Sequence, residues 1–460
     1  MSNNDNNLPD TIRGSARVRL GHSELAVRPI GLGCMGMSQF YGPADDAQSV
    51  ATIRTALDLG VDFLDTSDIY GAADVNMGAK IRGFGHNERL IGEAIAGRRD
   101  AVVLATKFSA RLSEDGKDVV MDGRPEYVAE ACEASLRRLG VETIDLYYCH
   151  RIDPNVPVEE TVGAMARLIE QGKVRAIGLS EASVEQLRRA HRVQPLTALQ
   201  SEYSLWERGV EAEILPTCRE LGITFVPFSP LARSSLTGAL QVGASFAAGD
   251  FRASNPRFAS ENLASNLVPV ETLKAIAESK GCRPGQLALA WLLLQPFDIV
   301  PIPGTKRAVY VEENLAATNV ALSPDEIAYI SSVFAPERIV GQRYAPIHAV
   351  HVANKNNHAK ASTPSADAAA SATSTTAIRK VRFTSIRDVA QTSQMRNQRS
   401  LPAAGADGES QPFFAPQDRP YEWAVTARKR SSAEGVGLAT TGRSLRPSEC
   451  VRSTEATSIC

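Results

Sequence analysis

The sequence has few of the residue patterns that mark metal-dependent or nucleophilic enzymes. It contains no Cys-x-x-Cys pair, no Gly-x-Ser-x-Gly elbow, no Walker loop and no His-Glu-x-x-His motif. These absences argue against a structural zinc site, a serine hydrolase, a P-loop nucleotidase and a zinc protease. The cysteines are scattered along the chain, at Cys34, Cys132, Cys149, Cys218, Cys282, Cys450 and Cys460. We therefore expect no bound metal, and free thiols in a reducing compartment.

Long apolar runs and a strong net charge are also missing. No apolar stretch approaches the ~20 residues that a membrane-spanning helix needs. The first residues, Met1–Asp10, are polar and lack the apolar stretch of a signal peptide. The formal net charge is −2, and residues 1–350 carry 35 Lys and Arg against 43 Asp and Glu. We therefore expect a soluble cytoplasmic protein whose partners are neither membranes nor nucleic acid.

The two ends of the chain differ in composition from its middle. Residues 351–460 are rich in Ala, Ser, Thr and Arg, with 15 Lys and Arg against 9 Asp and Glu. Apolar residues are too sparse there to build a core, so the composition predicts a disordered, low-complexity tail. Residues 1–16 predict a flexible leader, which leaves residues 17–350 as the folded domain.

Short apolar runs alternate with amphipathic segments through residues 17–350. The runs that predict strands are Arg28–Leu32, Val61–Asp65, Ala101–Lys107, Thr143–His150, Val174–Leu179, Ala198–Gln200, Thr224–Phe228 and Asp298–Ile302. Gly60, Gly140 and Gly172 follow helical segments, as is typical of left-handed helix ends. Eight such units predict an α/β fold of the (β/α)8 TIM barrel type, with a doubly wound open sheet as the alternative. Residues Arg17–Pro29 predict an N-terminal β-hairpin.

Four polar residues lie at or just past the ends of separate predicted strands: Asp65, Tyr70, Lys107 and His150. Because all carboxyl ends of parallel strands open on one face, we expect these side chains to share a pocket. A phenol, an ammonium, a carboxylate and an imidazole together make a proton-transfer site. Lys107 is expected to lower the pKa of the Tyr70 phenol, and Asp65 to hold Lys107. A proton donor without a nucleophile or a metal indicates that a cofactor performs the difficult step.

Two further segments predict ligand contacts. Gly31–Gly36 matches Gly-x-Gly-x-x-Gly, but Tyr41-Gly-Pro interrupts any following helix, so a tight turn near a ligand is favoured over a Rossmann site. Lys306 and Arg307 stand at the start of a helical segment, where free N–H groups and two cations favour an anion. Surface cations without a ligand are the alternative reading.

Two loops are expected to cover the pocket. Ala72–Gly85 is rich in Gly and Ala, and Gln241–Asn266 has weak periodicity. Both follow strands of the active face. Merely variable surface loops are the alternative.

From Arg17 to Tyr344 the chain resembles the aldo-keto reductase superfamily, closest to the branch of pyridoxal-type and related carbonyl reductases of fungi and plants. The resemblance is carried by Leu32–Met37, Phe63–Gly71, Leu104–Phe108, Asp145–Asp153, Gly172–Ser180, Leu199–Trp206 and Ile302–Arg307. It implies a (β/α)8 barrel and NADPH-dependent reduction of an aldehyde or ketone. Tyr70 would be the general acid, Asp65 and Lys107 its tuning pair, and His150 the group that orients the carbonyl.

The resemblance also implies a set of cofactor contacts. Ser180 and Gln200 would hold the nicotinamide carboxamide, and Phe228 would stack on its ring. The pyrophosphate would be lined by Ser229, Leu231 and Arg233. The 2′-phosphate of NADPH would meet Lys306 and Arg307, and the adenine would face Glu313 and Asn314.

The chain departs from the family pattern near the cofactor. Phe228 stands where most members have Tyr, and Glu181 where many have Asn. Ala232, Ser234 and Ser235 replace two glycines and an apolar residue. These changes leave a nucleotide-sensing or scaffolding protein on the same barrel as the alternative function. The direction of the reaction, the natural carbonyl substrate and the oligomeric state stay open at this point.

Overall fold

The computed structural model describes residues 17–72, 82–113, 119–247 and 249–345. The predicted leader (1–16) and tail (351–460) lie outside these residues, as does most of the loop after Ala72. Within the described part of the chain, no helix is long and apolar enough to cross a membrane. The same residues include no group of three or more His, Cys, Asp or Glu that is arranged to hold a metal ion.

A parallel sheet of seven strands forms the centre of the fold. In spatial order the strands are β11 (Thr224–Phe228), β10 (Ala198–Glu202), β9 (Val174–Ser180), β8 (Ile144–Cys149), β5 (Val103–Phe108), β4 (Phe63–Asp65) and β3 (Leu32–Gly33). Every residue of β8 and of β10 is buried. This burial explains why the strands read as continuous apolar runs, because a parallel sheet is covered on both faces.

The chain after α8 (Pro284–Leu293) closes the ring of strands. Ile299 forms a parallel bridge to β11, and Gly304 forms one to β3. Pro301 and Pro303 lack an N–H group, so this segment pairs through isolated bridges rather than a regular ladder. The predicted (β/α)8 barrel is therefore confirmed, but the regular strand expected over Asp298–Ile302 is not formed.

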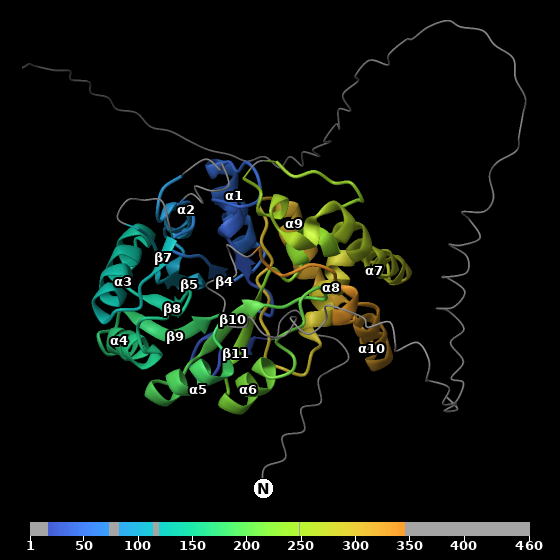
Figure 1. Cartoon of the computed structure of the whole chain (residues 1–460). Coiled ribbons are helices and arrows are strands. Elements are labelled where there is room, and N and C mark those ends of the chain that lie inside the picture. Colours follow the sequence, from blue (N-terminus) through green and yellow to red (C-terminus); the bar gives the residue numbers. More distant parts are fainter. Residues whose placement is uncertain (1–16, 73–81, 114–118, 248, 346–460) are drawn as a thin grey trace, which may run out of the picture. The chain divides into compact units, whose positions relative to one another are not determined.

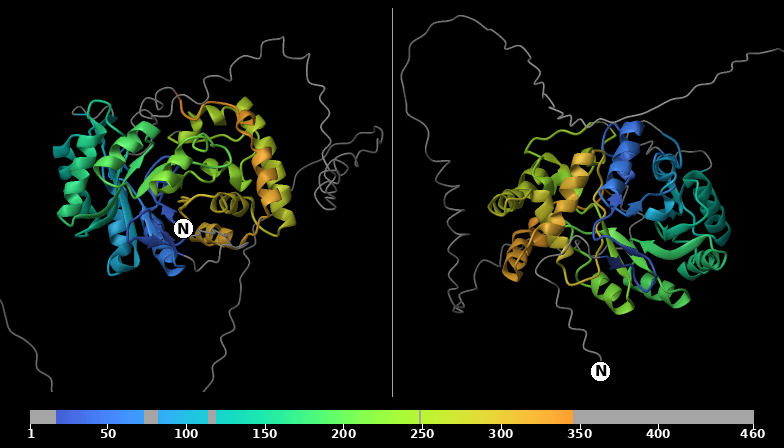
Figure 2. Two further views of the ribbon diagram at one scale, coloured as in Figure 1. Left: turned by 90° about the horizontal axis from the view of Figure 1, so that it is seen from below. Right: turned by 180° about the vertical axis from the view of Figure 1, so that it is seen from behind.

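The helices lie on the outer side of the strands (Figures 1 and 2). They are α1 (Asp46–Asp58), α2 (His86–Ile95), α3 (Pro125–Leu139), α4 (Val158–Glu170), α5 (Val184–Val193), α6 (Ile214–Leu221), α7 (Ser260–Ser279), α8 (Pro284–Leu293), α9 (Ala308–Leu315) and α10 (Pro324–Val333). Gly60, Gly140 and Gly172 have φ values of 90°, 66° and 71°. The left-handed helix ends predicted at these three glycines are thus confirmed.

A hairpin closes the amino-terminal end of the barrel. Strands β1 (Val18–Arg19) and β2 (Ala26–Val27) pair antiparallel, and Leu20 and Leu25 between them pack into the barrel interior. Gly21 N–H donates to Thr224 Oγ1 at 2.8 Å, and a Cβ at Gly21 would lie 2.6 Å from a backbone oxygen of Thr197. Among the described residues the hairpin thus covers the amino-terminal end, and the cavity lies at the opposite, carboxyl end of the strands.

Two irregular regions border that carboxyl end. Strands β6 (Ala110–Leu112) and β7 (Val119–Met121) form a second antiparallel hairpin after β5. The segment expected as a loop over Gln241–Asn266 instead contains two short 3-10 helices, η4 (Phe251–Ala253) and η5 (Pro256–Phe258), and the first turns of α7.

Candidate active site

An amine, a carboxylate and a phenol meet at the carboxyl ends of β4 and β5. Lys107 Nζ donates to Asp65 Oδ1 at 2.6 Å, to the Thr66 carbonyl oxygen at 2.7 Å and to Tyr70 Oη at 3.3 Å. The other carboxylate oxygen of Asp65 accepts from Gln200 Nε2 at 2.7 Å. Each lysine proton therefore has an acceptor, and the phenol oxygen is one of them.

Pairing keeps these buried groups charged. Lys107 is completely buried, and Asp65 is 3% exposed. Burial acts to lower the pKa of Lys107, but Asp65 and Tyr70 together outweigh it, so the amine's pKa lies above its usual value. Burial raises the pKa of Asp65, against the lowering effect of Lys107 and Gln200. An isolated charge is too costly to bury, so the two side chains form an ion pair at neutral pH.

Tyr70 differs from the sequence-based expectation in one respect. Burial raises the pKa of the Tyr70 phenol above its usual value, and the nearby Asp65 carboxylate adds to the increase. Lys107 lowers this pKa, as expected, but does not outweigh the burial. The lowering effect expected of Lys107 is present, but the expected net lowering of the Tyr70 pKa was wrong. The phenol is held protonated, which is the form that can donate a proton.

His150, directly after β8, is an uncharged neighbour of this group. Burial lowers the pKa of its imidazole well below the usual value, and Arg151 and Lys107 lower it further. The His150 ring lies edge-on to the Tyr70 ring, with 5.8 Å between their centroids. His150 Nδ1 is 3.1 Å from Ser67 Oγ. Neutral His150 can present one N–H and one acceptor nitrogen, but it is not a cation.

One cavity of about 660 Å³ adjoins these groups, a size typical of small-molecule and cofactor sites. Its wall includes Asp65, Tyr70 and His150, whereas Lys107 lies behind them without lining it. The cofactor residues expected from the resemblance that line the same cavity are Ser180, Gln200, Phe228, Ser229, Leu231, Arg233, Lys306 and Arg307. Glu313 and Asn314, expected to face adenine, are not part of this wall. They belong to α9, and the Asn314 side chain is buried.

Left-handed backbone follows β11 in the loop that lines the cavity. Ser229, Ala232, Arg233 and Ser234 have φ values of 50°, 47°, 54° and 78°. Residues with a Cβ rarely adopt this conformation, and glycine adopts it without strain. The replacement of two glycines by Ala232 and Ser234 has therefore not straightened the loop. Runs of such backbone turn N–H groups toward one side and favour anions.

The two cations expected at the 2′-phosphate differ in availability. Lys306 Nζ donates to the carbonyl oxygens of Tyr41 and Pro43 at 2.7 and 2.8 Å, and burial lowers its pKa. Arg307 is the residue before α9, and its side chain makes no hydrogen bond or ion pair within the described residues. Lys306 thus ties down the Tyr41–Pro43 segment, and Arg307 keeps a free guanidinium at the cavity wall.

Arg233 has a structural partner that the sequence did not indicate. Its guanidinium donates to both carboxylate oxygens of Glu202 at 2.5 and 3.1 Å. Glu202 also accepts from Arg343 Nε at 2.8 Å, and Arg343 Nη2 reaches Glu181 at 2.6 Å. Glu181, which replaces the Asn of many relatives, has a left-handed φ of 58°. Its carboxylate binds Arg343 and the N–H of Glu202 at 3.0 Å.

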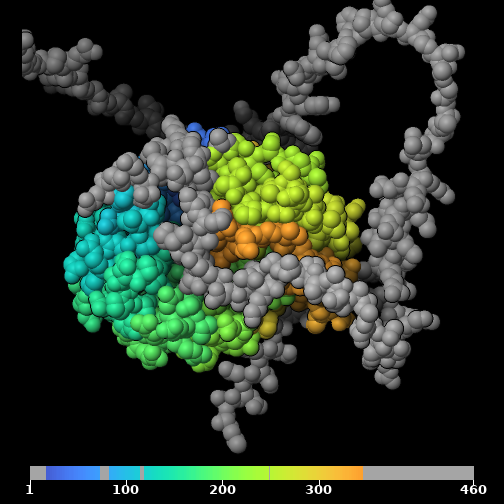
Figure 3. Space-filling view, viewed as in Figure 1, coloured from blue at the N-terminus to red at the C-terminus, as the bar shows by residue number. Residues whose placement is uncertain are grey.

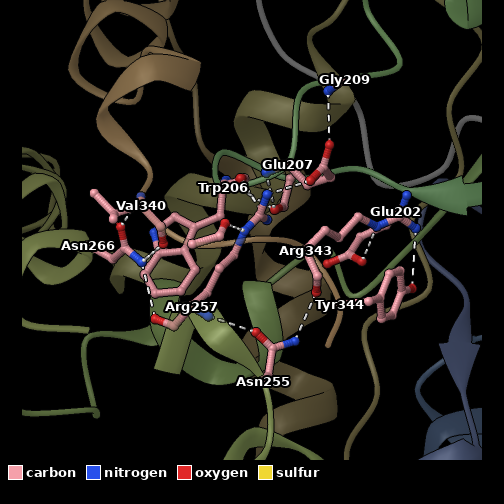
Figure 4. Close-up of polar contacts among 12 residues, drawn as sticks. Glu202, Trp206, Glu207, Gly209, Asn255, Arg257, Asn266, Val340, Arg343 and Tyr344 are labelled. Carbon is pink, nitrogen blue, oxygen red and sulfur yellow. Dashed lines mark hydrogen bonds and ion pairs between the residues drawn. The ribbon is translucent and has the colours of Figure 1, made fainter. Parts of the chain in front are cut away.

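The chain after α10 crosses the carboxyl end of the barrel through this network; we call residues 339–344 the C-terminal strap. Asn255 donates to the Arg343 carbonyl oxygen, and Asn266 binds both the N–H and the carbonyl of Val340 (Figure 4). On the surface, the orange C-terminal part of the described chain lies against the yellow-green residues before and within α7 (Figure 3). The strap also places Tyr344 in the cavity wall.

Four residues that line the cavity were not predicted from the sequence. Arg151, Phe251, Arg252 and Tyr344 line the cavity, but none lies on a strand that pattern reasoning could align with the tetrad. Only Arg151 carried a signal, because it directly follows the predicted strand end at His150.

Comparisons with known proteins agree with this geometry. A sequence model of the Aldo/keto reductase family matches residues 29–335. A glycerol dehydrogenase of Gluconobacter oxydans is 28% identical with a TM-score of 0.63, over 72% of this chain and 98% of that one. An aldo/keto reductase of Klebsiella pneumoniae, solved with NADP and acetate, is 28% identical with a TM-score of 0.53 over the same shares. The holo form of an aldo-keto reductase of Bacillus halodurans is 25% identical with a TM-score of 0.56, over 70% and 96%. The chain belongs to the aldo/keto reductase family.

Proposed function

We propose that this protein reduces an aldehyde or a ketone to the alcohol with NADPH, and that Tyr70 is the general acid. The observation that carries the proposal is the buried Lys107 amine, 2.6 Å from Asp65 and 3.3 Å from the phenol oxygen. Tyr70 and His150 line the same cavity as the residues expected to hold the cofactor. The family membership and the NADP bound by the Klebsiella pneumoniae relative support the same reading.

The residues of the cavity suit a nicotinamide dinucleotide. Phe228 offers an aromatic face, Ser180 and Gln200 offer polar groups beside it, and the left-handed loop after Ser229 offers backbone N–H groups. Arg307, at the start of α9, offers an unpaired cation for a phosphate. When bound, NADPH supplies the hydride that reaches the carbonyl carbon.

The protein's own residues supply the proton and the orientation. Tyr70 transfers its phenolic proton to the carbonyl oxygen as negative charge develops there. Lys107 stabilises the phenolate that remains, and Asp65 keeps the amine protonated and in place. In this proposal Ser67 donates to His150 Nδ1, so that the Nε2 proton of His150 is available to orient the same carbonyl oxygen.

The test is NADPH oxidation with a panel of simple aldehydes and ketones, for the wild-type protein and Tyr70→Phe. Loss of a general acid lowers turnover by about 10²- to 10⁴-fold, while NADPH affinity, measured by fluorescence titration, stays near the wild-type value. Wild-type turnover by Tyr70→Phe would refute the role of the phenol. Tight NADPH binding without turnover of any carbonyl would favour the nucleotide-sensing alternative instead.

Three finer points belong to the same proposal. The cofactor is NADPH rather than NADH, because Arg307 stands unpaired where the resemblance expects the 2′-phosphate; equal kcat/KM with NADH would overturn this preference. The protein works in the cytoplasm and belongs to the branch of pyridoxal-type and related carbonyl reductases. Activity on pyridoxal in the same panel tests the branch.

A further inference from the structure

Arg151, beside the candidate reaction centre, has N–H donors for which the described residues supply no acceptor. Arg151 follows His150 and lines the cavity. Its Nη1 donates to the His150 carbonyl oxygen at 2.6 Å and to Ser180 Oγ at 3.0 Å. Its Nε and Nη2 have no hydrogen-bond partner, and its charge has no carboxylate within ion-pair distance, in the part of the chain that the structure describes. The guanidinium is thus oriented through one nitrogen and unsatisfied along its other edge.

The other cations near this end of the cavity are already neutralised. Lys107 pairs with Asp65, Arg233 with Glu202, and Arg252 with Asp250 at 2.7 Å. Arg151 is half-buried, and its field contributes to the lowered pKa of His150. A cation that is partly removed from water without a partner carries an electrostatic cost that an anionic ligand would remove.

Much of the cavity wall near Tyr70 is apolar. Three residues, Ile69, Ala72 and Ala110, are buried together with Tyr70 and pack against Met35, Leu112 and Met121. All six of these apolar residues line the cavity. A ligand in this part of the cavity therefore meets one apolar surface and one free guanidinium edge.

We propose that Arg151 binds a carboxylate of the substrate, so that the preferred substrates are carbonyl compounds with an apolar body and an acid group. The Nε–Nη2 edge of a guanidinium holds two parallel N–H groups, which match the two oxygens of a carboxylate. The fixed Nη1 contacts hold that edge in place before the substrate arrives. This inference rests on the proposed carbonyl reduction and names its substrate class.

A purely structural role makes a different prediction. If Arg151 serves only to hold Ser180 and the turn after β8, its loss weakens cofactor binding and slows all substrates alike. If it binds a carboxylate, its loss acts selectively on acids and mainly through KM. The informative quantity is therefore the ratio of kcat/KM for an acid to that for its uncharged ester.

The experiment uses the full chain and two substrate pairs: benzoylformate with its methyl ester, and meta-carboxybenzaldehyde with its methyl ester. We expect the wild-type protein to favour the acids. In Arg151→Gln the acid-to-ester ratio should fall by about 10- to 100-fold, the range of one charge-assisted bidentate contact. Arg151→Lys keeps the charge but loses the two parallel N–H groups, so its acid-to-ester ratio should lie between those of the wild type and Arg151→Gln. The matched control is Arg188→Gln, an exposed arginine of α5 that is paired with Glu220 and lies outside the cavity wall, whose ratio should match the wild type.

An unchanged ratio in Arg151→Gln, or a wild-type preference for the esters, overturns the inference while leaving carbonyl reduction intact. Absence of turnover with every carbonyl refutes the proposed reaction instead. In that case calorimetric titration of benzoylformate into the protein with NADP⁺ decides the inference. Binding that is lost in Arg151→Gln supports it, and no binding to the wild-type protein refutes it. NADPH titration of each variant shows whether the fold and the cofactor site are retained.

Discussion

The buried carboxylate of Glu202 should account for a measurable share of the stability of the barrel. It ends β10, is 1% exposed, and accepts hydrogen bonds from Arg233 and Arg343. Burial acts to raise the pKa of Glu202, but Arg233 and then Arg343 outweigh it and lower the pKa from 4.5 to about 2. A shift of this size corresponds to about 3 kcal/mol of favourable interaction of the charged form.

The perturbation is Glu202→Gln, which keeps the shape and removes the charge. It leaves the buried Arg233 guanidinium without its counter-charge, whereas Arg343 keeps its ion pair with Glu181; breaking a buried pair in this way typically costs about 3–5 kcal/mol. We therefore expect the free energy of unfolding at pH 7 to fall by about 3–4 kcal/mol, measured by urea denaturation. The control is Glu220→Gln, which removes an exposed partner of Arg188 and should have a far smaller effect.

The pH dependence gives a second, independent readout. Because the folded pKa of Glu202 is depressed, its contribution is complete above the unfolded value of 4.5 and is lost as the pH falls toward about 2. The difference in unfolding free energy between the wild type and Glu202→Gln should therefore shrink as the pH is lowered through that window. A difference below about 1 kcal/mol at pH 7, or one that does not change with pH, would refute the reasoning.

Two further predictions concern packing and protonation. A Cβ at Gly178 in β9 would lie 2.5 Å from the Tyr148 ring and 2.6 Å from the Ala198 carbonyl oxygen, so Gly178→Ala should destabilise the barrel by about 1–3 kcal/mol. The control Gly163→Ala in α4, where nothing lies within 4 Å, should be neutral or stabilising by up to about 1 kcal/mol; equal thermal unfolding temperatures for the two variants would contradict the packing argument. Because burial holds the pKa of His150 well below 6.5, the profile of log kcat/KM against pH should show no step from this histidine near pH 6.5. A step there that disappears in His150→Gln would contradict this prediction.

Much of the barrel follows from local patterns. Continuous apolar runs predicted the buried parallel strands, and glycines predicted the ends of three helices, because both depend on residues close together in the sequence. The regular strand predicted over Asp298–Ile302 is replaced by isolated bridges. Prolines limit its pairing, and their effect depends on the neighbouring strands. The sequence did not predict the short helices within Gln241–Asn266, because contacts with the C-terminal strap stabilise them.

The candidate site also combines features that the sequence predicts with features that depend on tertiary contacts. The placement of Asp65, Lys107 and His150 at strand ends could be read directly, because the carboxyl ends of parallel strands share one face. The net effect on the pKa of Tyr70 could not be read, because it is a balance between the depth of burial and the distance to Lys107. The partner of Arg233 was equally hidden, since Glu202 comes from a different strand.

The sequence by itself determined the family, the order of strands and helices, and the residue types available for proton transfer. Spacing and side-chain chemistry are properties of the chain alone. Only the tertiary structure decided which cations are neutralised and which are free, because Arg343 meets Glu181 and Glu202 across 162 and 141 positions of sequence. It likewise left one edge of Arg151 unpaired beside His150. Electrostatic pairing depends on distances of a few ångströms, and those distances exist only once the barrel has closed.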